Sequence, residues 1–192
     1  MSKRAKLNTI RIIGGHWRGR RLPVIESQGL RPTIDRVRET LFNWLMHDLA
    51  GARCLDLFAG SGALGLESLS RGAGFVKFIE SNSGVAGQLQ ENLSVLVGEK
   101  SLLSAQVTCT SALSYLSKMS TEPYDIVFLD PPFDADLLDR SLNLLIGNNY
   151  LSEGALIYVE QDVQKQALKV PPSWSLRRQG KAGQSAYYLY SS

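Results

Sequence analysis

Apolar residues recur along this 192-residue chain with two different periods. After residue 53, short apolar runs typical of strands alternate with stretches in which apolar residues return every three or four positions, as on one face of a helix. The expected strands cover residues 53–59, 75–81, 105–111, 124–130 and 154–160, and the expected helices cover 62–72, 83–97, 112–119 and 135–147. This alternation predicts an α/β fold, with a parallel sheet covered by helices on both faces.

The two ends of the chain depart from this alternation. Residues 174–191 predict a terminal antiparallel hairpin. Residues 9–15 and 19–25 predict two short strands around a turn, and residues 31–49 predict a helix with Thr33 as its N-cap. We therefore expect two parts, a basic arm with a β-hairpin in residues 1–30 and a Rossmann-like domain in residues 31–192.

Charge is distributed unevenly between these parts. The formal net charge is +3, but residues 1–53 carry +7 and the remainder −4. A basic arm on a mildly acidic body favours a partner with a phosphate backbone, although a solvated, solubilising tail has the same composition. We expect neither a membrane span nor a signal peptide, and Cys54 and Cys109 fit small buried residues in a reducing cytoplasm.

A glycine-rich segment lies between the first strand and the first helix of the Rossmann-like part. Gly60, Gly62 and Gly65 form the spacing GxGxxG. Glycines let the backbone turn tightly and approach a ligand, and the helix start offers free N–H groups to an anion. Glu80 ends the next strand, where a carboxylate can accept both ribose hydroxyls. The segment predicts a dinucleotide or S-adenosylmethionine as ligand, with a purely structural turn as the alternative.

Asp56, four residues before Gly60, distinguishes between these two ligands. Its carboxylate would repel the pyrophosphate of a dinucleotide, whereas it would attract the ammonium and sulfonium groups of S-adenosylmethionine. The sequence therefore favours S-adenosylmethionine. We assign to the cofactor site Asp56, Phe58, Gly60, Gly62 and Glu80.

The sequence FLDPPFD, residues 128–134, ends the fourth strand. Asp130 therefore faces the same crevice as the glycine loop. Pro131 and Pro132 fix the backbone and lack N–H donors, which leaves carbonyl acceptors there, and Phe133 offers a ring that can stack on a base. Two acceptors beside a ring suit an exocyclic amine, because they hold its hydrogens while its lone pair points at a methyl donor. We expect these four residues to be catalytic without a metal; the alternative is a strand-ending turn.

These motifs occur together in a known family. DLFAGSGALGLE followed by DPPF resembles the class I S-adenosylmethionine-dependent methyltransferases that act on amino groups. The block IRIIGGHWRGRRL with RPTIDRVRETLFNWL, the segment EGALIYVE and the terminal AGQSAYYLY resemble the RsmD family of 16S ribosomal RNA (guanine-N2)-methyltransferases. The resemblance extends from Thr9 to Tyr190.

The resemblance implies a Rossmann-like, mostly parallel seven-stranded sheet with a C-terminal antiparallel hairpin, preceded by a small β-hairpin and helix extension. It implies methylation of the exocyclic N2 amine of one guanine in small-subunit rRNA, with S-adenosylhomocysteine as product. The substrate would be a ribosomal particle in the cytoplasm, and we expect a monomer. Asp130 would also lie against the cofactor. Many class I enzymes hold the adenine with an Asp after the third strand, and here Ser111 or a neighbouring backbone group must serve.

Basic and ring side chains alternate in the N-terminal block. We expect RNA contacts from Arg11, Arg18, Arg20 and Arg21, with His16 and Trp17 interleaved, while Arg31 and Arg36 meet either RNA or the mouth of the active site.

Three other functions are compatible with these residues. One is methylation of another nitrogen, in DNA adenine or protein glutamine, although DNA enzymes of this type usually need a target-recognition domain for which this chain has no room. Another is a nicotinamide-dependent oxidoreductase. The third is a non-catalytic RNA-binding factor in ribosome assembly, in which both motifs would be idle. Residue chemistry alone specifies only an exocyclic or amide nitrogen.

Overall fold

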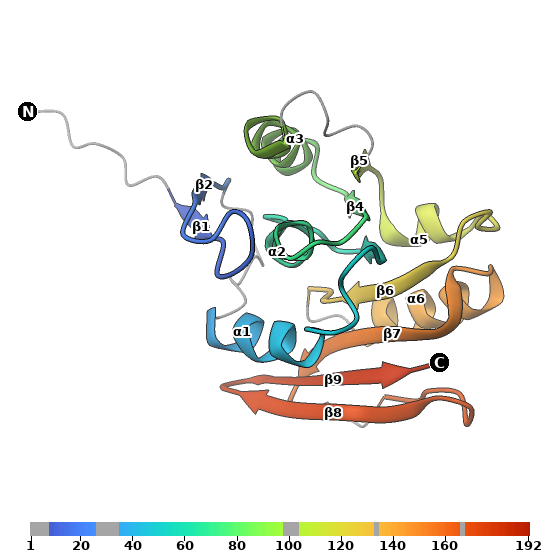
Figure 1. Ribbon diagram of the computed structural model, residues 1–192. Helices are drawn as coiled ribbons and strands as arrows, with labels where there is room; N and C mark the ends of the chain where they lie inside the picture. Colours follow the sequence, from blue (N-terminus) through green and yellow to red (C-terminus); the bar gives the residue numbers. More distant parts are fainter. Residues whose placement is uncertain (1–7, 26–34, 98–103, 133–134, 166–167) are drawn as a thin grey trace, which may run out of the picture.

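The computed structural model describes residues 8–25, 35–97, 104–132, 135–165 and 168–192. Its central sheet contains β3 (Arg53–Asp56), β4 (Phe75–Glu80), β5 (Ala105–Cys109), β6 (Tyr124–Leu129), β7 (Leu151–Asp162), β8 (Ser175–Ala182) and β9 (Ser185–Ser191). These strands lie in the order β5-β4-β3-β6-β7-β9-β8 (Figure 1). Strands β3 to β7 run parallel, whereas β9 runs antiparallel to β7 and to β8. The predicted α/β class, seven-stranded sheet and C-terminal hairpin are confirmed.

Helices cover both faces of this sheet. They are α1 (Asp35–Trp44), α2 (Ala63–Ser70), α3 (Ser83–Val97), α5 (Ala112–Leu116) and α6 (Ala135–Gly147). The apolar sides of α1, α2 and α3 pack on one face, against Phe78 and Phe128, while α5 and α6 pack on the other, against Leu55 and Val127. Because successive strand residues point to opposite faces, strands buried on both sides consist of continuous apolar runs. None of the helices in the described ranges has the length and apolar content that crossing a membrane requires.

Some expected boundaries differ from the structure. Helix α1 ends at Trp44 rather than at residue 49, and the chain continues as a turn in which the Asp48 N–H donates to the Leu45 carbonyl at 3.0 Å. Cys54 is buried as expected, but Cys109 is exposed. The reason is that Cys109 ends β5, which lies at the edge of the sheet.

The N-terminal hairpin is a separate two-stranded sheet of β1 (Thr9–Arg11) and β2 (Arg21–Pro23). Both strands are shorter than the predicted 9–15 and 19–25. The N–H groups of Ile12 and Gly19 still pair across the hairpin, whereas those of Ile13, Gly14 and Trp17 bind side chains of α2. The expected division of the chain at residue 30 lies outside the described residues, as do Arg31, Thr33 and Phe133.

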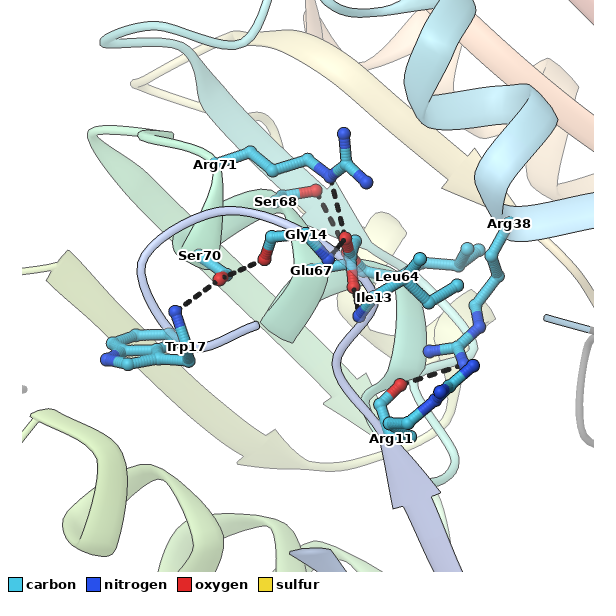
Figure 2. A network of polar contacts seen from close by, with 10 residues as sticks. All are labelled: Arg11, Ile13, Gly14, Trp17, Arg38, Leu64, Glu67, Ser68, Ser70 and Arg71. Atoms are coloured by element: carbon cyan, nitrogen blue, oxygen red, sulfur yellow. Dashed lines mark hydrogen bonds and ion pairs between the residues drawn. The ribbon is translucent and has the colours of Figure 1, made fainter. Parts of the chain in front are cut away.

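Two side chains of α2 fix the hairpin loop to the rest of the molecule, as Figure 2 shows. Glu67 is fully buried, and its carboxylate accepts hydrogen bonds from the N–H groups of Ile13 and Gly14, both at 2.8 Å. Ser70 accepts a hydrogen bond from the Trp17 N–H at 2.9 Å and donates one to the Gly14 carbonyl at 2.6 Å. We call these contacts the α2 latch. It joins the basic hairpin to the helix that follows the glycine loop.

Candidate active site

Three carboxylates lie at the carboxyl ends of three neighbouring strands. Asp56 ends β3, Glu80 ends β4, and Asp130 directly follows β6. Strand β3 lies between the other two, with Asp56 in register with Phe78 on one side and Phe128 on the other. The chain leaves β3 toward β4 and later returns to β6 on the opposite side. This is the point at which strand order reverses, where open α/β sheets bind ligands.

The glycine loop connects β3 to α2 and contacts Glu80. Gly60 and Gly62 have φ angles of +51° and +78°, a region that residues with a side chain rarely adopt. The Gly60 N–H donates to Oε2 of Glu80 at 2.9 Å. A Cβ on Gly65 would lie 2.2 Å from the Phe78 ring, so this glycine allows α2 to pack closely on β4. The loop is therefore shaped by its backbone and fixed by the carboxylate predicted to receive ribose.

Both carboxylate oxygens of Glu80 have backbone partners. Besides the Gly60 contact, Oε1 accepts a hydrogen bond from the Asn82 N–H at 2.7 Å. A carboxylate has about four lone-pair sites, so acceptor capacity remains for hydroxyl donors. Asn82 itself, which the sequence reasoning missed, caps α3 by accepting hydrogen bonds from the N–H groups of Gly84 and Val85 at 3.0 and 3.1 Å. An Asn at the start of an apolar helical pattern was the available signal.

Asp56 was predicted to contact the cofactor, but it is almost completely buried and its carboxylate binds the backbone of α2. Its side chain is 3% exposed, and Oδ2 accepts a hydrogen bond from the Gly65 N–H at 2.9 Å. Burial raises the pKa of Asp56 to about 7, with a further increase from the charge of Glu80 and an opposing effect from the Gly65 hydrogen bond. The carboxylate thus anchors the start of α2, a role not anticipated from the sequence. A cationic group bound nearby would favour its ionised form.

Replacing Asp56 with asparagine is expected to change the pH dependence of stability. The pKa is raised on folding, so the native protein binds more protons than the unfolded chain, and stability falls as pH rises from about 4 to about 7. Asparagine keeps an acceptor for Gly65 and removes this dependence. The free energy of unfolding of Asp56→Asn, relative to the unmodified chain, should increase by roughly 2–3 kcal/mol between pH 5 and pH 8.

Urea denaturation at both pH values measures this difference. Asp139→Asn, which alters an exposed carboxylate of α6, serves as the matched control. A difference between Asp56→Asn and the unmodified chain that stays constant with pH would contradict the buried, proton-binding carboxyl.

Asp130 lies half-buried at the mouth of the same edge, followed by a buried Pro131 and an exposed Pro132. Behind it, the fully buried Tyr158 of β7 donates a hydrogen bond to Oε2 of Glu160 at 2.8 Å. Burial, the charge of Glu160 and then the charge of Asp130 all raise the pKa of Tyr158, so its hydroxyl stays protonated. Sequence reasoning missed Tyr158 and Glu160. A glutamate inside the apolar run of β7 was the signal.

Ser111 and Phe58, the remaining residues predicted to contact the cofactor, differ in their exposure to solvent. Ser111 is exposed beyond the end of β5, where its Oγ accepts a hydrogen bond from the Ser114 N–H at 3.2 Å and caps α5. The preceding Thr110 N–H donates to the Glu80 carbonyl at 2.9 Å, so Ser111 lies at the same edge of the sheet. Phe58 is half-buried and packs against the apolar cluster under α5 and α6.

Most of the predicted RNA-contact residues are exposed. They are Arg11, His16, Arg18, Arg20, Arg21 and Arg36, whereas Trp17 is half-buried. Arg11 forms an ion pair with Asp35 at 3.0 Å. The structure therefore brings four predicted arginines onto the hairpin, and Arg36 onto the adjoining α1. Within the described ranges, no group of three or more His, Cys, Asp or Glu side chains could hold a metal ion.

Comparison with known proteins gives consistent matches over nearly the whole chain. The family model described as Conserved hypothetical protein 95 matches residues 10–191. The chain is 54% identical over 181 residues to the ribosomal RNA small subunit methyltransferase D of Escherichia coli, covering 94% of this chain and 89% of that protein. It is 49% identical over 182 residues to the protein of the same name from Haemophilus influenzae, covering 94% and 93%.

Solved structures agree with these sequence matches. A putative methyltransferase from Escherichia coli superposes with a TM-score of 0.88 at 50% identity, covering 96% of this chain and 98% of that one. A 16S rRNA N2 methyltransferase of T. thermophilus, in complex with AdoMet and guanosine, superposes with a TM-score of 0.66 at 22% identity, covering 97% of this chain and 50% of that one. At that identity the second match shows the shared fold alone.

Proposed function

The chain belongs to the Conserved hypothetical protein 95 family, the RsmD family of ribosomal RNA small subunit methyltransferase D, and from this premise we propose that it methylates the N2 amine of a guanine in 16S rRNA. The methyl donor is S-adenosylmethionine and the product S-adenosylhomocysteine. One observation carries the proposal: Asp56, Glu80 and Asp130 lie at the carboxyl ends of three adjacent parallel strands, beside a loop with two glycines of positive φ.

The residues at this edge fit the cofactor by the chemistry of their donors and acceptors. When bound, S-adenosylmethionine supplies a methyl group activated by its positively charged sulfur. Glu80 would accept hydrogen bonds from the ribose hydroxyls. The negative charge of the Asp56 carboxylate would attract the ammonium and sulfonium groups of the cofactor. Gly60 and Gly62 let the backbone approach the ligand, while Phe58 and Ser111 would border the adenine.

Asp130 would hold the target amine. Its carboxylate and the carbonyl of Pro131 can accept the two amine hydrogens, which turns the nitrogen lone pair toward the methyl donor. Pro132 stiffens this turn, and Phe133 would stack on the guanine. Asp130 would also take the proton that the amine loses. Tyr158, hydrogen-bonded to Glu160, lies close enough for the charge of Asp130 to raise its pKa.

We place the reaction in the cytoplasm, on a small-subunit particle rather than on free RNA, with the enzyme acting as a monomer. The basic hairpin would supply the phosphate contacts through Arg11, Arg18, Arg20 and Arg21, and Arg31 and Arg36 would contact either RNA or the mouth of the active site. The residues 1–30 would then act as an RNA-binding extension of the methyltransferase domain in residues 31–192.

The test uses S-adenosylmethionine with a radiolabelled methyl group. The protein is offered small ribosomal subunits from cells that lack it, naked rRNA and duplex DNA. We expect label in the subunits, recovered after digestion as N2-methylguanosine. Label confined to DNA or protein would overturn the choice of substrate, and the absence of label from every substrate despite measurable cofactor binding would overturn the activity.

Glu80→Gln is expected to weaken S-adenosylmethionine binding about 10- to 100-fold, because hydrogen bonds to a charged acceptor contribute roughly 1.5–3 kcal/mol. Isothermal calorimetry measures the dissociation constant.

Glu80 also accepts a hydrogen bond from Gly60, so a change in the glycine loop must be distinguished from the loss of the ribose contact. An S-adenosylhomocysteine analogue without ribose hydroxyls makes that separation. If it loses as much affinity in the variant as S-adenosylhomocysteine does, the ribose assignment is wrong. Glu91→Gln, on the exposed side of α3, is the control.

A further inference from the structure

A pocket of about 350 Å³ lies between the N-terminal hairpin, α1 and the first residue of α2. Three arginines line it, Arg11 from β1, Arg21 from β2 and Arg38 from α1, together with Asp35 and Ala63. Ala63 directly follows Gly62 of the glycine loop, so the pocket adjoins the candidate active site. No role was predicted for Arg38 from the sequence.

Arg38 is unusual for a cation because its side chain is only 3% exposed. Its Nη2 donates hydrogen bonds to the Arg11 carbonyl, at 3.0 Å, and to Oδ1 of Asp35. Its Nε is buried and has no hydrogen-bond partner among the described residues. Removing a charged guanidinium from water is costly, so the buried Arg38 at the wall of this pocket favours a negatively charged group beside it.

Arg11 and Arg21 provide a second, independent indication that the pocket binds a negatively charged group. They are directly opposite each other in the register of the β1–β2 hairpin, so two like charges face each other across the strands. Such cross-strand pairs destabilise a hairpin unless a counter-charge lies between them. Among the described residues that line the pocket, Asp35 is the one carboxylate, and it already accepts hydrogen bonds from both Arg11 and Arg38. The described part of the lining has three guanidinium groups and one carboxylate, which leaves an excess of positive charge there.

We propose that this pocket binds a phosphate group of the rRNA strand next to the nucleotide that enters the active site. A guanidinium group can donate two parallel hydrogen bonds to two oxygens of one phosphate. Arg11 and Arg21 belong to the same hairpin as the exposed Arg18 and Arg20, and this row of basic side chains suits a polyanion rather than an isolated ion. The proposal rests on the proposed function and assigns to Arg38 the positioning of the substrate strand. The carboxylate of the cofactor has related chemistry, and the experiment distinguishes the two.

The test compares Arg38→Gln and Arg21→Gln with Arg53→Gln. Arg53 is a matched control at the opposite end of β3, because it too pairs with a carboxylate, Glu122, and has a buried Nε without a partner in the described ranges. Each variant is assayed for thermal unfolding, for S-adenosylmethionine affinity by calorimetry, and for binding and single-turnover methylation of unmethylated small subunits at several salt concentrations.

Both pocket variants should bind subunits at least about 10-fold more weakly, with the slope of log affinity against log salt reduced by roughly 0.7–1. Their cofactor affinity should stay within about twofold of the unmodified protein. Arg21→Gln keeps the buried ion pair, so it tests the pocket even where Arg38→Gln unfolds. Weaker cofactor binding would assign the pocket to the cofactor carboxylate and overturn the proposal, as would subunit binding equal to that of Arg53→Gln. Failure of the unmodified protein to label subunits would instead overturn the proposed function.

Discussion

Replacing Asp130 with alanine is expected to slow methyl transfer by roughly 100- to 1,000-fold while S-adenosylmethionine still binds. The exocyclic amine of guanine is a weak nucleophile, because its lone pair is delocalised into the ring. Its reactivity therefore depends on the acceptors that hold its hydrogens, and alanine removes the stronger of the two. The Tyr158–Glu160 hydrogen bond joins two side chains of β7 and does not itself require the Asp130 carboxylate.

Single-turnover methylation of small subunits, with calorimetry of cofactor binding, measures the two effects separately. Asp130→Asn keeps one acceptor oxygen and should retain more activity than Asp130→Ala. Asp139→Ala, on an exposed turn of α6, should be indistinguishable from the unmodified protein. An Asp130→Ala protein with unchanged single-turnover rate would remove this residue from the mechanism.

Glu67→Gln is expected to reduce the free energy of unfolding by about 3–5 kcal/mol, although Glu67 touches neither proposed ligand. Its buried carboxylate accepts hydrogen bonds from Ile13, Gly14 and the Arg71 Nε, the last at 2.6 Å. Glutamine has one acceptor oxygen, so it leaves a buried N–H group unsatisfied and the Arg71 guanidinium without its counter-charge.

Urea denaturation gives the change in unfolding free energy, and the melting temperature should fall by roughly 6–20 °C. Glu91→Gln makes the same substitution on the exposed side of α3 and should lie within about 0.5 kcal/mol of the unmodified protein. A loss below about 1 kcal/mol for Glu67→Gln would mean that water or a rearranged loop replaces the latch.

The sequence predicted the sheet and the positions of the three carboxylates because both depend on local patterns. Strand and helix periods identify the βα units, and the topology then brings the strand ends to one edge. Contacts between distant segments carry no such pattern. The hairpin strands are shorter than predicted, and the N–H groups of Ile13 and Trp17 in the loop bind Glu67 and Ser70, more than 50 residues later. The anchoring of Gly65 by Asp56 and the Tyr158–Glu160 pair join residues only nine and two positions apart. They escaped prediction because the direction of a side chain, unlike a strand or helix period, leaves no repeat in the sequence.

The α2 latch also has a consequence for the order in which the chain acquires its shape. The loop from Ile13 to Trp17 is synthesised first, yet its partners lie 53 to 56 residues later. Chains leave the ribosome N-terminus first. Bringing residues 13–17 against α2 closes a loop of more than 50 residues, and the entropy that this costs is offset by the buried contacts with α2. The basic arm should therefore leave the exit tunnel as an open, positively charged peptide beside ribosomal RNA. The N-terminal hairpin would take its folded shape only when α2 has followed.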